Sequence, residues 1–253
     1  MITLLAMPTP YKPQTLERLL QSQGFGSRKA CRLLVESGRV TINGERYLQA
    51  NTLFTPPTLT FNVNGEDWPW RQYLYLALYK PAGFECSRTP QHHNSVFGLL
   101  PPHFVERGIQ PVGRLDADTT GLLLLTDDGD FNHAMASPKR HVPKTYQIQA
   151  RHTVSDEQIV ALLAGVQLHD EPAPLAALAA EKQSDTVLEL TIDQGKYHQV
   201  KRMLAAAGNR VDGLHRLAIG TLRLGEGCLA GLAEGHWCEL DATALHQLGY
   251  TAV

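Results

Sequence analysis

The segment around residue 116 places acidic and basic side chains between two glycines. Gly113 and Gly121 bracket Arg114 and Asp116, and the apolar run 122–125 follows directly. Such a run beside a charged loop predicts a buried strand that holds the loop rigidly. An ionised carboxylate held in this way can act as a nucleophile or as a base. Asp116 is therefore the first candidate for a catalytic residue.

Two later segments carry side chains that could serve the same site. Lys144 and Tyr146 open an alternating stretch that predicts a half-buried strand. Residues 195–203 read Gly-Lys-Tyr-His-Gln-Val-Lys-Arg-Met, and a helix is predicted from Tyr197 to Ala207. An aromatic ring such as Tyr146 can stack on a base. A cation such as Lys201 favours the charged form of a partly desolvated carboxylate.

These three segments, in this order, resemble the motifs of the pseudouridine synthases. The resemblance implies that Asp116 is the catalytic residue, that Tyr146 lies against the target uracil, and that Lys201 pairs with Asp116. It covers about residues 73–250, and the dipeptide Lys80-Pro81 after a predicted strand also recurs in the family. Strands and helices do not alternate regularly along this part of the chain. We therefore expect an α+β fold with a mixed, mainly antiparallel central sheet.

The implied reaction breaks the bond from ribose C1′ to uracil N1 and joins C1′ to C5 of the turned base. It needs no redox change, group donor or metal, so we expect no cofactor. The base must leave its stack, at a cost of a few kcal/mol, roughly, that stacking on Tyr146 offsets in part. Arg114 is placed to fill the vacated space or to hold a phosphate. The residues leave open whether Asp116 attacks C1′, attacks the base or removes a sugar proton.

The N-terminal region predicts a small module of two helices and a hairpin. Ser27 is a candidate N-cap for the second helix, and Asn43-Gly44 between two short apolar segments is a strong hairpin signal. We expect Ala30, Leu33, Leu34 and Val35 on the apolar side of that helix. This order resembles the small RNA-binding domain first found in the fourth protein of the small ribosomal subunit. The predicted organisation is a flexible N-terminus (1–13), an RNA-binding domain (14–63), a linker (64–72) and a catalytic domain (73–253).

The formal net charge of −2 gives no nucleic-acid signal, but basic residues are clustered locally. Such clusters suit a phosphate backbone, although solvated faces would look the same. The residues predicted to contact RNA are Arg28, Lys29, Arg32, Arg114, Lys144, His198, Gln199 and Arg202.

Composition and the ends of the chain bound the class of protein. With 253 residues, 43% of them hydrophobic, the chain can form one sizeable core and a smaller domain. The four cysteines include no Cys-x-x-Cys pair, so no zinc site of that type is predicted, and their sparse use suggests a reducing compartment. The first residues lack the pattern of an export signal. We expect a cytoplasmic monomer without membrane segments.

The branch and the substrate rest on the resemblance alone. The N-terminal module and residues 196–203 are similar to the ribosomal small-subunit (RsuA-type) branch, which implies 16S ribosomal RNA and its uridine 516 as target, in an assembly intermediate. Relatives acting on 23S RNA tend to carry Asn-Arg-Gln-Val-Arg-Arg-Met there. The alternatives are a 23S enzyme, a non-catalytic RNA-binding assembly factor and a metal-dependent nuclease. The weakest alternative is a calcium loop at Asp116–Asp127, because a predicted strand interrupts it.

Overall fold

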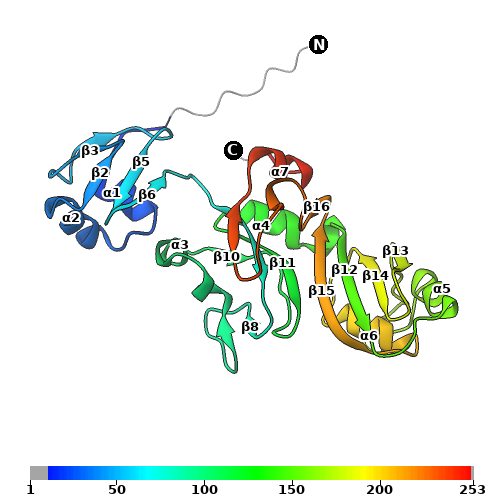
Figure 1. Cartoon of the computed structure of the whole chain (residues 1–253). Helices are drawn as coiled ribbons and strands as arrows, with labels where there is room; N and C mark the ends of the chain where they lie inside the picture. Colours follow the sequence, from blue (N-terminus) through cyan, green and yellow to red (C-terminus); the bar gives the residue numbers. More distant parts are fainter. Residues whose placement is uncertain (1–10, 252–253) are drawn as a thin grey trace, which may run out of the picture. The chain divides into compact units, whose positions relative to one another are not determined.

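The computed structural model describes residues 11–251, which form two compact units (Figure 1). The N-terminal unit consists of residues 11–74 together with 100–109, and the C-terminal unit consists of residues 75–99 and 110–251. No helix within residues 11–251 is long and apolar enough to cross a membrane.

The N-terminal unit contains two short helices, α1 (Leu16–Ser22) and α2 (Arg28–Glu36). The Ser27 hydroxyl accepts a bond from the backbone N–H of Ala30, as an N-cap does. The predicted apolar side of α2 was wrong in part. Cys31 and Val35, four residues apart and therefore on one face, are fully buried, whereas Leu33 is 55% exposed.

A four-stranded antiparallel sheet, in the order β3-β2-β5-β6, completes this core. Its strands are β2 (Val40–Ile42), β3 (Glu45–Arg46), β5 (Thr60–Val63) and β6 (Glu66–Pro69), and a separate pair joins β1 (Gln14–Thr15) to β4 (Leu53–Phe54). The turns Asn43-Gly44 and Asn64-Gly65 both have positive φ values. The segment predicted as a linker is therefore a hairpin strand, because Asn64-Gly65 turns the chain back onto β5.

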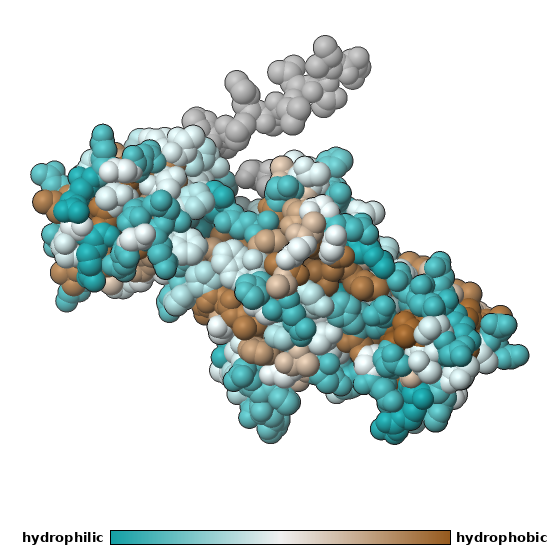
Figure 2. All heavy atoms as spheres, in the orientation of Figure 1, coloured by the Kyte–Doolittle hydropathy of each residue, from teal (hydrophilic) through white to brown (hydrophobic). Residues whose placement is uncertain are grey.

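The N-terminal unit also recruits a helix from the range predicted as the catalytic domain. Helix α3 (Pro102–Glu106) carries His103, whose ring stacks on Phe25 with centroids 4.7 Å apart. The residues expected to be loose at the N-terminus are packed in part, since Tyr11 lies edge-on to Trp70. Residues 1–10 lie outside the described range. On the face of this unit seen in Figure 2, hydrophilic and neutral residues predominate.

The C-terminal unit is built on a nine-stranded sheet, and this confirms the predicted α+β fold with a mixed, mainly antiparallel sheet. The strand order is β13-β14-β12-β15-β11-β7-β17, with β10 added to β11 and β16 to β15. Within this sheet, as far as the structure describes it, β11 and β15 are the only neighbouring strands that run parallel. The strands are β7 (Tyr75–Lys80), β10 (Gln110–Pro111), β11 (Thr120–Thr126), β12 (Lys144–Ala150), β13 (Ala179–Lys182), β14 (Val187–Ile192), β15 (Val211–Ile219), β16 (Leu222–Arg223) and β17 (Trp237–Glu239).

Helices and short turns surround this sheet. The helices are α4 (Gly129–Ala136), α5 (Asp156–Ala164), α6 (Gln199–Ala206) and α7 (Ala242–Gln247), with 3-10 turns η1 (Val96–Leu99), η2 (Pro138–Arg140) and η3 (Gly227–Leu229) and a small parallel pair β8 (Phe84–Glu85) and β9 (Asn94–Ser95). The predicted capping box of Ser155 and Gln158 starts α5. Asp128 caps α4 and also accepts hydroxyl bonds from Tyr75 and Tyr250.

The buried strand β11 fixes the position of the charged loop before it. Leu122, Leu123, Leu124 and Leu125 are fully buried between β7 and β15. Gly121 has φ +107°, and a Cβ there would lie 2.3 Å from the carbonyl oxygen of Arg216. Only glycine allows β11 and β15 to approach this closely, so the loop is held at a defined place on the sheet.

Candidate active site

The loop that carries Asp116 is a tight turn whose backbone carbonyls are bonded by a buried lysine. The backbone N–H of Thr119 donates to the carbonyl oxygen of Asp116 at 3.1 Å. The ammonium of Lys80, at the end of β7, donates to the carbonyls of Thr119 (2.8 Å), Pro81 (3.0 Å) and Ala117 (3.3 Å). Burial lowers the pKa of Lys80. The Lys-Pro dipeptide thus shapes the loop without contacting Asp116 itself.

Lys201 on α6 bridges two carboxylates of this loop. Its Nζ donates to Oδ2 of Asp116 at 3.0 Å and to both oxygens of Asp118, at 2.8 and 2.9 Å. Burial by itself lowers the pKa of Lys201, but the bonds to Asp118 and Asp116 outweigh it and raise the pKa. The same bonds lower the pKa of Asp118 against the opposing effect of burial. The expected pairing of Lys201 with Asp116 is therefore present.

His198 contacts the other oxygen of the Asp116 carboxylate. Its Nε2 lies 3.2 Å from Oδ1, and its ring stacks on Tyr197 with centroids 3.8 Å apart. His198 precedes α6 with φ +46°, a left-handed conformation that is strained for a non-glycine residue. Residues held in such strain cluster at functional sites.

Two residues predicted to contact RNA are engaged inside the protein. Gln199 is buried, and its amide accepts from the N–H of Lys196 and donates to Gln194. Arg202 donates to the carbonyl of Tyr197 and lies 3.1 Å from Asp170. These contacts hold residues around the start of α6 in place. They also use polar groups that a contact with RNA would need.

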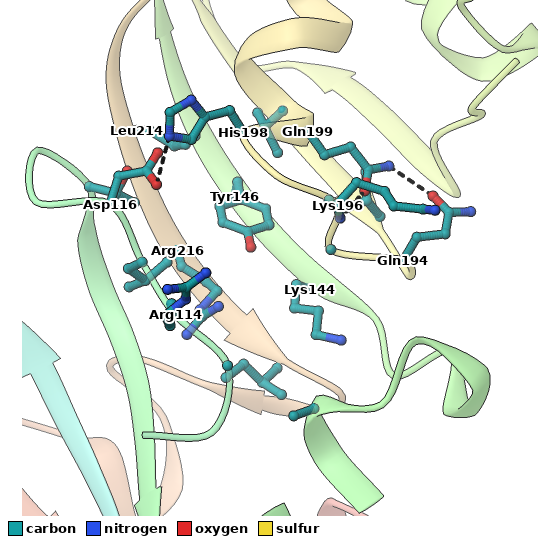
Figure 3. A pocket seen from close by; sticks show the side chains of 18 of the residues that line it. Arg114, Asp116, Lys144, Tyr146, Gln194, Lys196, His198, Gln199, Leu214 and Arg216 are labelled. Atoms are coloured by element: carbon teal, nitrogen blue, oxygen red, sulfur yellow. Dashed lines mark hydrogen bonds and ion pairs between the residues drawn. The ribbon is translucent and has the colours of Figure 1, made fainter. Parts of the chain in front are cut away.

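The remaining predicted residues of this unit converge on one pocket, shown in Figure 3. The pocket encloses about 790 Å³, open solvent at its mouth included. Its lining includes Arg114, Asp116, Lys144, Tyr146, His198, Gln199, Val200 and Lys201. Tyr146 presents a buried ring there, whereas Arg114 is exposed. A base entering the pocket can therefore meet an aromatic ring and the Asp116 carboxylate together.

One face of the sheet forms the opposite wall of the pocket. Lys144 and Tyr146 are two residues apart on β12 and share this face. Tyr146 pairs with Arg216 on β15 across a register shift, which leaves Leu217 as an extra residue. This bulge turns Arg216 to the face of Tyr146, where a regular strand would point it away. Burial, and then the charge of Arg216, lower the pKa of Lys144 to about 8.

The predicted RNA contacts of the N-terminal unit gather around a buried carboxylate. Glu17 on α1 accepts from Nε of Arg28 at 2.5 Å and from Nε of Arg32 at 2.8 Å. Both arginines remain about half exposed, and Lys29 beside them is also exposed.

Two family models match this chain. The model for RNA pseudouridylate synthases matches residues 74–206, and the model of the S4 domain matches residues 14–56. The chain belongs to the RNA pseudouridylate synthase family. It is therefore an enzyme of the isomerase class that carries an S4 domain at its N-terminal end.

Similar proteins span nearly the whole chain. An RNA pseudouridine synthase of Bacillus subtilis, described as uncharacterised, is 39% identical and covers 92% of this chain and 97% of its own length. The ribosomal small subunit pseudouridine synthases A of Pasteurella multocida and Escherichia coli are 37% and 36% identical, each over 88% of this chain and 94% of their own. A solved pseudouridylate synthase superposes with a TM-score of 0.64 at 32% identity, covering 93% of this chain and 99% of that one.

Sequence reasoning missed three residues of this synthase's site. The bridging role of Asp118 depends on a contact with Lys201, 83 residues later. Lys80 stands at the end of an otherwise apolar strand, a signal for a buried, paired lysine. Arg216 reaches the pocket through a bulge, for which the sequence gives no recognisable signal.

Proposed function

We propose that this chain converts a single uridine of small-subunit ribosomal RNA, uridine 516 of 16S RNA, to pseudouridine. Asp116 is the catalytic carboxylate, Lys201 its charge partner and Tyr146 the residue on which the flipped base stacks. The observation that carries the catalytic assignment is the Asp116 carboxylate, bonded by Lys201 at 3.0 Å and facing the same pocket as the Tyr146 ring.

The contacts of Asp116 suit a carboxylate that reacts. Lys201 and His198 each contact one of its oxygens, and the bond from the Lys201 ammonium is charge-assisted. Its side chain stays one-third exposed, so a substrate can reach it. The reaction exchanges two bonds for two others: C1′–N1 and C5–H break, while C1′–C5 and N1–H form. The proton lost from C5 and the proton gained by N1 balance the equation.

The choice of RNA rests on relatives and on the N-terminal unit. The similar enzymes of Pasteurella multocida and Escherichia coli carry the small ribosomal subunit in their names. A pocket for one base cannot tell one uridine from another, so selection must come from the RNA around it. In this proposal Arg28, Lys29 and Arg32 contact phosphates of that RNA, and an assembly intermediate offers a more defined shape than naked RNA.

The test compares ribosomal RNA from a strain that lacks the gene with RNA from its parent. Carbodiimide mapping should show that one pseudouridine stop is lost from 16S RNA and that 23S RNA is unchanged. Loss of a 23S stop, with the 16S stop retained, would contradict the proposed substrate and leave the chemistry intact.

Purified protein tests the role of Asp116 separately. We expect Asp116→Asn to release tritium from uracil C5 at least a thousandfold more slowly than wild type, about 4 kcal/mol in barrier, because the amide is neither nucleophile nor base. Affinity for RNA should stay within about threefold. Asp185→Asn is the matched control, since Asp185 is exposed and paired only with Lys182 among its described contacts. Turnover by Asp116→Asn within tenfold of wild type would contradict the assignment.

A further inference from the structure

Two buried cations in the pocket have no part in the chemistry assigned to Asp116. Lys144 is 9% exposed and Arg216 is 4% exposed, and both line the pocket with Tyr146. Figure 3 shows the hydroxyl end of the Tyr146 ring directed toward the end of the pocket where these two side chains lie.

Neither cation is neutralised by a direct partner. The guanidinium of Arg216 is oriented by one bond, from Nε to the carbonyl of Leu122 at 2.7 Å, while its buried Nη2 has no hydrogen-bond partner. The Lys144 ammonium makes no hydrogen bond or ion pair within the described part of the chain. The nearby carboxylate of Asp193 favours its charge without an ion pair to it: Oδ2 of Asp193 is bonded to His141 at 2.9 Å, and the buried Oδ1 has no hydrogen-bond partner.

Such an arrangement is costly unless a ligand completes it. A buried N–H donor without an acceptor destabilises the fold, and two like charges on one face of the sheet repel each other. We propose that Lys144 and Arg216 form a cationic subsite that binds a carbonyl oxygen of the target uracil and stabilises the negative charge that the base acquires during the reaction. This inference rests on the proposed function.

The chemistry requires such a subsite whichever route Asp116 takes. If Asp116 attacks C1′, or removes a sugar proton, the C1′–N1 bond breaks and its electron pair passes to the base, where O2 and O4 share the charge. If Asp116 adds to the base, the ring electrons pass to a carbonyl oxygen. Donors fixed in advance at the place where charge develops are an effective form of catalysis, and the fixed Arg216 supplies one.

The depth of the two cations favours a base over a phosphate. Lys144 and Arg216 lie beside Tyr146 on the same face of the sheet. A base stacked on the Tyr146 ring would direct one of its edges toward them. Arg114, in contrast, is exposed at the same pocket and suits a backbone phosphate. A phosphate at Lys144 remains the alternative that the experiment must separate.

The first measurement is single-turnover kinetics on an RNA in which wild-type protein forms pseudouridine. We expect Lys144→Met to slow the bound complex about a hundredfold, and Lys144→Gln, which keeps an N–H donor, to slow it less. Methionine has a similar length, and removing a buried unpaired cation should preserve the fold, which thermal unfolding checks. Lys182→Met on β13, outside the pocket, is the matched control.

The second measurement identifies the group that Lys144 contacts. The target uridine is replaced by 2-thiouridine and by 4-thiouridine, because sulfur is a weaker acceptor than oxygen. One of these replacements should lower the single-turnover rate of wild type about tenfold. The same replacement should hardly change the rate of Lys144→Met, since that variant has already lost the contact. Methylphosphonates at the flanking linkages should slow both proteins equally.

The outcomes separate this inference from the proposed function. If wild type makes no pseudouridine in any ribosomal RNA, the proposed function fails. If wild type is active and the single-turnover rate of Lys144→Met is within twofold of the wild-type rate, the proposed subsite is contradicted and the proposed function is not. Additive effects with both thiouridines, or coupling to a methylphosphonate instead, would also overturn the assignment to the base.

Discussion

Each unit of the molecule holds a carboxylate between two basic side chains, and the two clusters differ in how far the carboxylate is exposed. In the N-terminal unit Glu17 is 1% exposed, while Arg28 and Arg32 are 51% and 53% exposed. In the C-terminal unit Asp116 is 33% exposed, and Lys201 beside it is 26% exposed. The first cluster therefore presents cations to the solvent, and the second makes a carboxylate accessible.

This difference matches two different tasks on one RNA. Exposed guanidinium groups, oriented by a buried anion, can bind phosphates at little cost in side-chain freedom. An accessible carboxylate beside a cation can react. A carboxylate between two basic side chains thus suits binding where the carboxylate is buried and chemistry where it is accessible, and substitutions in each cluster should separate affinity from rate.

The largest effect on this comparison should come from Lys201→Met. Without the ammonium, the carboxylates of Asp116 and Asp118 lose the cation they share. We expect a fall in the single-turnover rate of roughly 10²–10³, as for loss of one preorganised partner, with RNA affinity nearly unchanged.

Lys201→Arg is the matched variant, since it keeps the charge and should restore most of the rate. Weaker RNA binding by Lys201→Met, with a normal rate for the bound complex, would assign Lys201 to binding and remove the contrast between the clusters.

An intermediate effect is expected from removing the exposed cations. The double substitution of Arg28 and Arg32 by Gln should weaken RNA binding on the order of tenfold near 0.15 M salt. The slope of log affinity against log salt should decrease by between about one and two, because two phosphate contacts are lost. Filter binding at several salt concentrations measures both quantities. The rate of the bound complex should not change.

Arg151→Gln provides the control, because Arg151 is similarly exposed, at 45%, but pairs with the exposed Asp212 of the other unit. An unchanged salt slope in the double variant would mean that this face of α2 does not contact phosphate.

The sequence predicted those parts of the site that depend on short patterns. The strand Lys144–Ala150 and the capping box at Ser155 lie where alternation and local capping placed them. The alternation also contained a missed signal: Lys144 shares the face of Tyr146 and Ile148, so its side chain is buried. The pairing of Lys201 with Asp116 came from resemblance.

Other features depend on contacts that no local pattern reports. Asn64-Gly65 is as strong a turn signal as Asn43-Gly44, but the acidic Glu66-Asp67 after it resembled a linker more than a strand. Helix α3 joins the N-terminal unit through rings such as His103 on Phe25, which meet only in the fold. The bulge that turns Arg216 into the pocket is likewise set by the pairing of two strands.

The smallest effect should come from Glu17, the buried carboxylate of the N-terminal cluster, and it concerns stability. The hydrogen bond from Arg32 lowers the pKa of Glu17 most, and Arg28 adds to this against the opposing effect of burial. A carboxyl group with a lowered pKa in the folded state binds fewer protons than it does unfolded, so it stabilises the fold fully above about pH 4.5. This stabilisation is lost as the pH falls through the folded-state value.

Glu17→Gln should therefore lower the Tm by about 2–5 °C at pH 7, and the difference from wild type should shrink below pH 4.5. Hydrogen exchange of the α1 and α2 amides in the full chain locates the change in the N-terminal unit. Glu36→Gln, an exposed carboxylate on α2, is the control and should show neither effect. A Tm difference that stays constant from pH 7 to pH 4 would show that the charge of Glu17 does not hold the arginines in place. RNA binding by Glu17→Gln should weaken less than in the double arginine variant, because the cations remain but are no longer oriented.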